Sequence, residues 1–260
     1  MSSNYWTTDD CARAFWDQHR ALPYQELLND TVRWLEPQPE ERWLDLGCGG
    51  GQLTAALWLE SQGSVGQIVA MDCAPINALA IEKLARKLQP APEPDQIHFE
   101  CGNFSDGLRQ FPNGSFHGVV SGLAISYAES VDPQTGRFTE DAYHRLLGEV
   151  SRVLKPGGRF VFSVNVPNPR FWKIFWRSLK IAFRVSKPGR VLVNAIRMQK
   201  YGSWLRREAA RGRFHFLPLP RILESLQQVG FGNPRSRLSY ADQAFVVRVE
   251  KMAASNIAAA

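Results

Sequence analysis

The feature of this 260-residue chain that most constrains its fold is a short apolar run that ends in a cluster of glycines. The run covers residues 42–46 (RWLDL), the glycine-rich turn covers 47–51 (GCGGG), and a helical pattern resumes over 52–62. An apolar run bounded by glycines is typical of a buried strand. Glycine permits positive φ angles and close approach of a ligand, and a following helix N-terminus favours anionic groups. The stretch therefore predicts a strand–turn–helix unit that binds a ligand at its turn.

Strand and helix patterns alternate along the rest of the chain. Further strand patterns cover residues 67–71, 97–101, 116–120, 159–164, 235–240 and 244–250. Further helical patterns cover residues 10–35, 76–88, 140–154 and 220–229. This alternation predicts an α/β fold with a seven-stranded, mostly parallel sheet and helices on both faces. We expect a single domain over residues 1–251, with an N-terminal helical cap (1–40), a helical lid insert (166–218) and a flexible tail (252–260).

Composition excludes several classes of protein. Hydrophobic residues make up 44% of the chain and charged residues 22%, values close to the averages of soluble globular proteins, which excludes a largely disordered chain. Four cysteines without a C-x-x-C pair predict reduced thiols, with neither a disulfide framework nor a metal site. The chain has no apolar run of about eighteen residues, so we expect no transmembrane helix and a cytoplasmic location.

Charge is distributed unevenly along the chain. Residues 170–213 contain thirteen basic residues against one acidic residue, Glu208, and so carry a formal charge of +12. Because the whole chain carries +6, the remainder carries −6. A strongly basic segment on an acidic body predicts an anionic partner for that segment: a surface, a substrate or a nucleic acid.

The first part of this basic segment has an amphipathic pattern. Its apolar positions are Trp172, Trp176, Leu179 and Phe183, and a basic residue follows each of them. A helix with an aromatic stripe beside a cationic one is typical of helices that lie on anionic bilayers. The alternative is a substrate lid that packs its aromatic side chains onto the sheet and leaves its charges in solvent. Both interpretations favour an apolar or amphiphilic ligand.

A carboxylate at the end of the second strand pattern adds to the glycine signal. Asp72 lies 21 residues after Gly51, where an acidic side chain can accept hydrogen bonds from both hydroxyls of an adenosine ribose. The dinucleotide fingerprint G-x-G-x-x-G would need a glycine at position 52, where Gln52 stands. The pattern therefore favours an adenosine ligand other than a nicotinamide or flavin dinucleotide.

Several segments together resemble a known family. They are Asp45 before G-x-G-x-G, Asp72, residues 102–104 (GNF), residues 116–123 and residues 154–159 (LKPGGR). In order and spacing they resemble class I S-adenosylmethionine-dependent methyltransferases, in particular the small-molecule subgroup related to ubiquinone and menaquinone methyltransferases. The resemblance covers residues 10–165 and 219–250. It implies a Rossmann-like sheet, a basic, aromatic helical insert after the fifth strand, and S-adenosyl-L-methionine as the cofactor.

The resemblance also implies roles for particular residues. Those expected to contact the cofactor are Asp45, Gly47, Gly49 and Gly51 at its methionine end, Asp72 at its ribose, Cys73, Asn103 and Phe104 at its adenine, and Ser121 and Leu123 beside the methionine. Asn103 stands where the family usually has aspartate. An amide offers one acceptor atom where a carboxylate offers two, so the adenine contact is expected to rest more on the Phe104 backbone. The alternative for Asn103 is a loop-capping residue.

The cofactor's sulfonium is already activated, so the protein mainly has to position the reactants and exclude water. A general base is needed only if the acceptor must lose a proton. The candidates from the sequence are His19, His215 and Tyr127, with Tyr24 and Glu129 also near the expected mouth of the site. The alternative for each histidine is a packing or surface residue.

The predicted activity is methyl transfer to oxygen or carbon of a hydrophobic or amphiphilic small molecule, quinone-like or lipid-like. An anionic membrane surface is a candidate partner of residues 170–213. The alternative is an RNA methyltransferase that uses the same segment. Residues 121–124 (SGLA) lack the [DNS]-P-P-[YFW] pattern of base-amino methylation, and no Pro-Cys pair occurs, so nucleic acid is the less favoured partner. A cofactor-binding regulator without catalysis is a further alternative.

Overall fold

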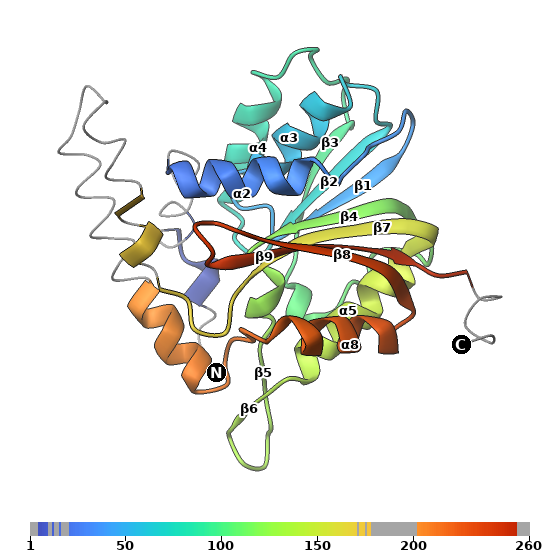
Figure 1. The fold of residues 1–260 in the computed structure, drawn as a ribbon. Helices are drawn as coiled ribbons and strands as arrows, with labels where there is room; N and C mark the ends of the chain where they lie inside the picture. The colour runs from blue at the N-terminus through green and yellow to red at the C-terminus, as the bar shows by residue number, and fades with distance from the viewer. Residues whose placement is uncertain are drawn as a thin grey trace.

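A seven-stranded sheet forms the centre of the computed structural model, which describes residues 5–9, 12, 16, 21–170, 172–174, 176–177 and 202–253. Its strands are β1 (Arg42–Leu46), β2 (Gln67–Asp72), β3 (Ile97–Cys101), β4 (Phe116–Gly122), β7 (Leu154–Asn165), β8 (Phe231–Ser239) and β9 (Ala244–Lys251). They lie in the order β3-β2-β1-β4-β7-β9-β8 (Figure 1). The predicted seven-stranded sheet is confirmed.

Strand direction places the functional edge of this sheet. Strands β3, β2, β1, β4 and β7 are parallel neighbours, and β9 runs antiparallel to both β7 and β8. The chain passes from β1 outward to β2 and β3 and then returns to the other side of β1 with β4. This reversal is a topological switch point, and ligands of open α/β sheets bind beside the carboxyl ends of the strands there. The glycine turn that follows β1 lies at this point.

Helices cover both faces of the sheet (Figure 1). On one side lie α2 (Leu22–Val32), α3 (Gln52–Glu60) and α4 (Asn77–Ala85), and on the other α5 (Asp141–Val153) and α8 (Leu219–Gln228). Strand β1 has cores on both sides: Trp43 packs with Leu57 and Trp58 of α3, whereas Leu44 belongs to the cluster that holds α5 and α8. Burial on both faces explains why β1 reads as a continuous apolar run rather than an alternating one.

Several boundaries differ from the sequence prediction. Within the predicted helical stretch 10–35, α2 begins only at Leu22, with Pro23 in its first turn. Strand β7 begins at Leu154, five residues before its predicted start, because the LKPGGR stretch joins the sheet. A small hairpin of β5 (Ser130–Val131) and β6 (Phe138–Thr139) was not predicted. Short 3₁₀ helices, η1 (Tyr5–Thr7), η3 (Phe104–Asp106) and η4 (Ile125–Tyr127), complete the elements used below.

The predicted insert is described only in part. Residues 172–174, 176–177 and 202–210 are helical, whereas Leu179, Phe183 and most of the basic stretch between these helical parts lie outside the described residues. The amphipathic helix of this segment therefore stays a prediction. The tail from residue 254 onward also lies outside the described residues. Among the residues that the structure describes, no helix is long and apolar enough to cross a membrane.

Candidate active site

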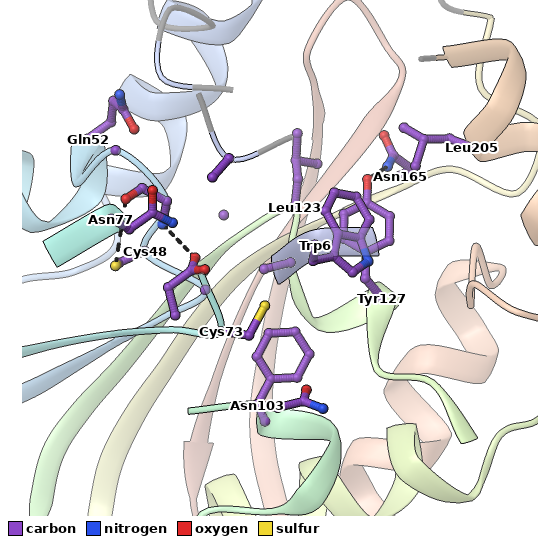
Figure 2. Close-up of a pocket in the computed structure, with 18 of the residues that line it drawn as sticks. Trp6, Cys48, Gln52, Cys73, Asn77, Asn103, Leu123, Tyr127, Asn165 and Leu205 are labelled. Carbon is purple, nitrogen blue, oxygen red and sulfur yellow. Dashed lines mark hydrogen bonds between the residues drawn. The ribbon is translucent and has the colours of Figure 1, made fainter. Parts of the chain in front are cut away.

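A cavity of about 1180 Å³, counting the solvent at its mouth, opens beside the carboxyl ends of β1, β2, β4 and β7. Its lining comes from the glycine turn, the ends of these strands, η1, the loop between β8 and β9, and the helical residues 202 and 205. Figure 2 shows two groups of residues around it: Cys48, Gln52 and Asn77 on one side, and Trp6, Tyr127, Asn165 and Leu205 on the other, with Leu123 between them.

The glycine turn forms the floor of the first end of the cavity. The backbone N–H groups of Gly47 and Cys48 both donate to the carbonyl of Met71, at 2.8 and 2.9 Å, which ties the turn to the end of β2. Gly47 has a φ of +77°, and a Cβ there would lie 2.4 Å from the Cβ of Ala124. Gly49 has a φ of +51°, and no atom lies within 4 Å of where its Cβ would stand. The turn therefore presents bare backbone to the cavity.

Asp72 is joined directly to this turn. Its Oδ2 accepts a hydrogen bond from the Gly49 N–H at 2.9 Å, and its Oδ1 accepts one from the Ala74 N–H at 2.9 Å. Asn77 also hydrogen-bonds to this carboxylate, and the Asn77 Oδ1 accepts from the Trp16 indole N–H at 2.7 Å. Burial raises the pKa of Asp72, and the backbone hydrogen bonds oppose that rise. The carboxylate is thus held in one orientation at the cavity lining.

A second carboxyl group lies beneath the turn. Asp45 is fully buried, and its Oδ2 accepts a hydrogen bond from the Thr54 hydroxyl at 2.7 Å, while its Oδ1 has no partner among the described residues. Burial raises the pKa of Asp45 to about 7, and the charge of Asp72 adds to the rise. Of these two carboxyl groups only Asp72 lies on the cavity lining, so Asp72 is the one that can attract a cation there.

The other end of the cavity is aromatic. We define the aromatic chamber by the lining residues Trp6, Tyr24, Leu123, Tyr127, Leu205 and Tyr240. The rings of Trp6 and Tyr127 are stacked, with centroids 4.6 Å apart, and Tyr24 meets Tyr240 edge-on. The polar side chains of Asn165, at the end of β7, and Glu129 share the lining with them. Such a wall suits a flat, apolar ligand.

Comparison with known proteins supports the family resemblance. A family model described as a methyltransferase domain matches residues 44–162, from β1 with its glycine turn to β7. By this match and by the relatives below, the chain resembles the class I S-adenosylmethionine-dependent methyltransferases. S-adenosylmethionine is the cofactor that this resemblance implies.

Individual relatives agree with this family. The chain is 31% identical over 160 residues to a demethylmenaquinone methyltransferase of Symbiobacterium thermophilum (59% of this chain, 57% of that protein). It is 30% identical over 170 residues to the mouse EEF1A lysine methyltransferase 4 (60% of this chain, 62% of that protein). The chain therefore spans about three fifths of the length of these relatives. A solved O-methyltransferase family protein from Burkholderia thailandensis has the same fold, with a TM-score of 0.60, 16% identity, and coverage of 95% of this chain and 61% of that one.

The residues at the glycine end fit the cofactor. The open position at Gly49 leaves room for a ligand against the backbone, and Asp72 at the end of β2 can accept from ribose hydroxyls. The sulfonium and ammonium groups of S-adenosylmethionine are cations, which suits the Asp72 carboxylate at this end. Contact of these residues with the cofactor stays a prediction.

The structure divides the predicted cofactor residues into two groups. Those on the cavity lining are Gly47, Gly49, Asp72, Cys73, Asn103, Phe104 and Leu123. Asp45, Gly51 and Ser121 lie behind the lining instead. Gly51 begins α3, and the Ser121 hydroxyl donates to the Leu46 carbonyl at 2.7 Å, so these residues hold the turn and β1 in place.

Asn103 has the loop-capping role that the sequence left open. Its Oδ1 accepts a hydrogen bond from the Ser105 N–H at 3.1 Å, at the start of η3. The residue also lines the cavity. This bond uses one lone pair of the amide oxygen, and the adenine contact through the Phe104 backbone stays a prediction.

The three catalytic candidates have different positions. Tyr127 lines the cavity. His215 does not: it is buried, its Nε2 is 2.8 Å from the Ala128 carbonyl, and it faces a second cavity beside β6. Burial lowers the pKa of His215 and so favours its neutral form, and its position away from the cavity lining removes it as a base for this site. His19 lies outside the described residues.

Glu129, a further candidate, lies on the lining but is held by an ion pair. Arg213 binds both of its carboxylate oxygens and also reaches Glu208 at 3.3 Å. The Arg213 guanidinium lies over the rings of Phe138 and Phe214. Glu129 therefore anchors the chamber wall.

Sequence reasoning missed the chamber residues Trp6, Asn165, Leu205 and Tyr240. They come from four segments that are distant in sequence, so no local motif joins them. For Asn165 a signal existed: it is a polar residue directly after the mostly apolar run 160–164 (FVFSV).

Proposed function

We propose that this methyltransferase transfers the methyl group of S-adenosylmethionine to oxygen or carbon of a hydrophobic or amphiphilic small molecule, quinone-like or lipid-like. The observation that carries the proposal is the two-ended cavity, with the glycine turn and Asp72 at one end and the aromatic chamber at the other. The relative from Symbiobacterium thermophilum is named for demethylmenaquinone, an apolar quinone. An aromatic wall would bind such a molecule by area and stacking rather than by charge.

In this proposal the protein acts by positioning. The cofactor supplies an activated methyl group, so the chain's own residues have to orient the two reactants and keep water out. The glycine turn and Asp72 hold one end, and the stacked pair Trp6–Tyr127 shapes the other. In the chamber, the hydroxyl oxygen of Tyr127 accepts a hydrogen bond from the side-chain nitrogen of Asn165 at 3.3 Å. It is our candidate for hydrogen bonding to the reacting oxygen.

The described part of the basic segment, residues 170–213, favours a small-molecule acceptor over RNA. Three of its arginines bind carboxylates of the protein itself: Arg177 binds Glu26 at 2.9 Å, and Arg211 and Arg213 bind Glu208 at 3.0 and 3.3 Å. Side chains engaged in this way contribute less to a phosphate-binding surface. Methyl transfer to RNA remains the competing outcome of the test below.

The test is acceptor-dependent turnover. The purified protein is incubated with S-adenosylmethionine and either a bacterial lipid extract, bulk RNA or no acceptor, and S-adenosylhomocysteine is quantified. We expect product above the acceptor-free level with the lipid extract, and a methylated compound in its quinone or lipid fraction. Turnover with RNA but not with the lipid extract would contradict the proposal. The proposal would also be contradicted if the protein binds the cofactor but shows no turnover with the lipid extract or with RNA.

A further inference from the structure

The aromatic chamber contains a polar group without a partner. Asn165 is 1% exposed, and its side-chain N–H donates to the Tyr127 hydroxyl oxygen at 3.3 Å. Its Oδ1 has no hydrogen-bond partner in the part of the chain that the structure describes. Turning the amide over would exchange the two atoms and leave the nitrogen unpaired instead. In either orientation, one polar atom of a buried side chain is left unsatisfied.

None of the described residues of the surrounding wall supplies that partner. Figure 2 shows Asn165 between Leu205 and Tyr127, on the opposite side of the cavity from Gln52 and Asn77. The oxygen is shielded from solvent, so bulk water does not replace the missing bond. Buried polar groups in native proteins are nearly always hydrogen-bonded, so this unpaired amide oxygen calls for a partner.

The position of Asn165 fits a role toward the acceptor rather than the cofactor. It ends β7, whereas the glycine turn and Asp72 follow β1 and β2 on the other side of β4 in the sheet. Its backbone is fixed, because Asn165 pairs with Ala244 in the β7–β9 ladder. Because the strand fixes its position, this side chain can distinguish ligands that carry a matching polar group from ligands that lack one.

We propose that Asn165 recognises a hydroxyl group on the aromatic acceptor of this enzyme, an inference that rests on the proposed function. The acceptor hydroxyl donates to the Asn165 Oδ1, and the flat ring lies in the aromatic chamber against the stacked pair Trp6–Tyr127. A hydroxyl both donates and accepts, so it satisfies the amide in either orientation. A site built around a buried polar group rejects analogues that lack the matching hydroxyl. Asn165 is thus a specificity-determining residue that selects phenols over hydrocarbons of the same shape.

The test measures binding rather than turnover. Equilibrium dialysis with S-adenosylhomocysteine present compares 2-naphthol with 2-methylnaphthalene, which has the same outline without a hydroxyl. We expect the wild type to bind 2-naphthol about tenfold or more tightly than 2-methylnaphthalene. In Asn165→Leu the ratio of the two affinities should be close to one. Asn165→Val, which suits a strand, is a second variant for the same result. Calorimetry with S-adenosylhomocysteine should give an unchanged affinity for both variants, which shows that they are folded.

Leu205→Ala is the matched control, because it enlarges the chamber without touching the amide. It should shift the affinity for both ligands and keep their ratio. A ratio that stays at its wild-type value in Asn165→Leu or Asn165→Val overturns the inference, and so does a wild type that binds both ligands equally. If the wild type binds S-adenosylhomocysteine but neither naphthalene compound, the aromatic-acceptor function itself fails, and the inference with it.

Discussion

At the scale of single residues, the site depends on a glycine in a tight turn and on two aspartates that lie close to that turn. Gly47 fits against Ala124 only because it lacks a Cβ, Asp72 is oriented by the turn that it supports, and Asp45 is a buried acid beneath both. Each of these features has a measurable consequence for the stability of the fold.

Gly47→Ala should destabilise the protein by roughly 1–3 kcal/mol, because the new Cβ meets Ala124 and the φ of +77° is strained for alanine. Gly148→Ala is the control: Gly148 lies within α5, no atom lies within 4 Å of its Cβ position, and alanine favours helices. Urea unfolding measures both changes. Equal effects of the two substitutions would contradict the packing described for the turn.

Asp45 gives the fold a pH dependence. Because burial raises its pKa to about 7 in the folded state, folding favours the protonated form, and the free energy of unfolding should fall as pH rises from about 4 to about 7. Asp45→Asn removes this contribution, so its stability relative to wild type should improve over that range, by roughly 1.4 kcal/mol for each unit of pKa shift at most. Unfolding curves at several pH values test this. A difference between the two proteins that is constant with pH would contradict it.

At the scale of elements, the sequence allowed most of the sheet to be predicted but little of the chamber. The apolar runs of β1, β2 and β4 and the glycine turn follow local patterns, so their positions and the cofactor end could be read directly. The chamber draws on η1, η4, residues 202–210 and the β8–β9 loop, which tertiary packing brings together. The hairpin of β5 and β6 has strands of two residues, too short for a periodic signal.

An ion pair joins two of these unpredicted elements. Arg213 is largely buried and binds Glu129, after η4, and Glu208, in helix 202–210. Arg213→Met leaves the largely buried Glu129 without its cation and Glu208 with Arg211 alone, and should destabilise the protein by about 3–5 kcal/mol. Arg211→Met is the control, since Arg211 is 68% exposed and binds the same Glu208, and should cost about 1 kcal/mol or less. Thermal unfolding of both variants tests this, and similar losses would show that the buried pair is unimportant.

At the scale of the whole molecule, the chamber lies beside a surface that suits a bilayer. Trp172 and Trp176 are 50% and 57% exposed, while Ile174 between them is buried and packs in the cluster of Leu27, Tyr240 and Ala244. Lys173 follows the first tryptophan and supplies a basic side chain, whereas Arg177 after the second is paired with Glu26. We propose that this surface binds an anionic membrane and so places the chamber near apolar acceptors.

The membrane proposal predicts sedimentation with vesicles. Wild type should bind vesicles that contain phosphatidylglycerol, less so at high salt, because screening weakens the attraction. The double variant Trp172→Ala with Trp176→Ala should lose most of this binding, whereas Leu79→Ala, which removes an exposed side chain from α4, should not. Wild-type protein that never sediments with these vesicles would exclude the proposal.

The central claim, that the adenosyl cofactor is held between the glycine turn and Asp72, is tested most directly by calorimetric titration of S-adenosylmethionine into wild type and Asp72→Ala. Asp106→Asn, in an exposed position on η3, serves as the control. The structure predicts that Asp72→Ala weakens binding by about tenfold or more while the control binds like wild type, because the ribose loses its charged acceptor. Equal affinities of wild type and Asp72→Ala would contradict the site described above.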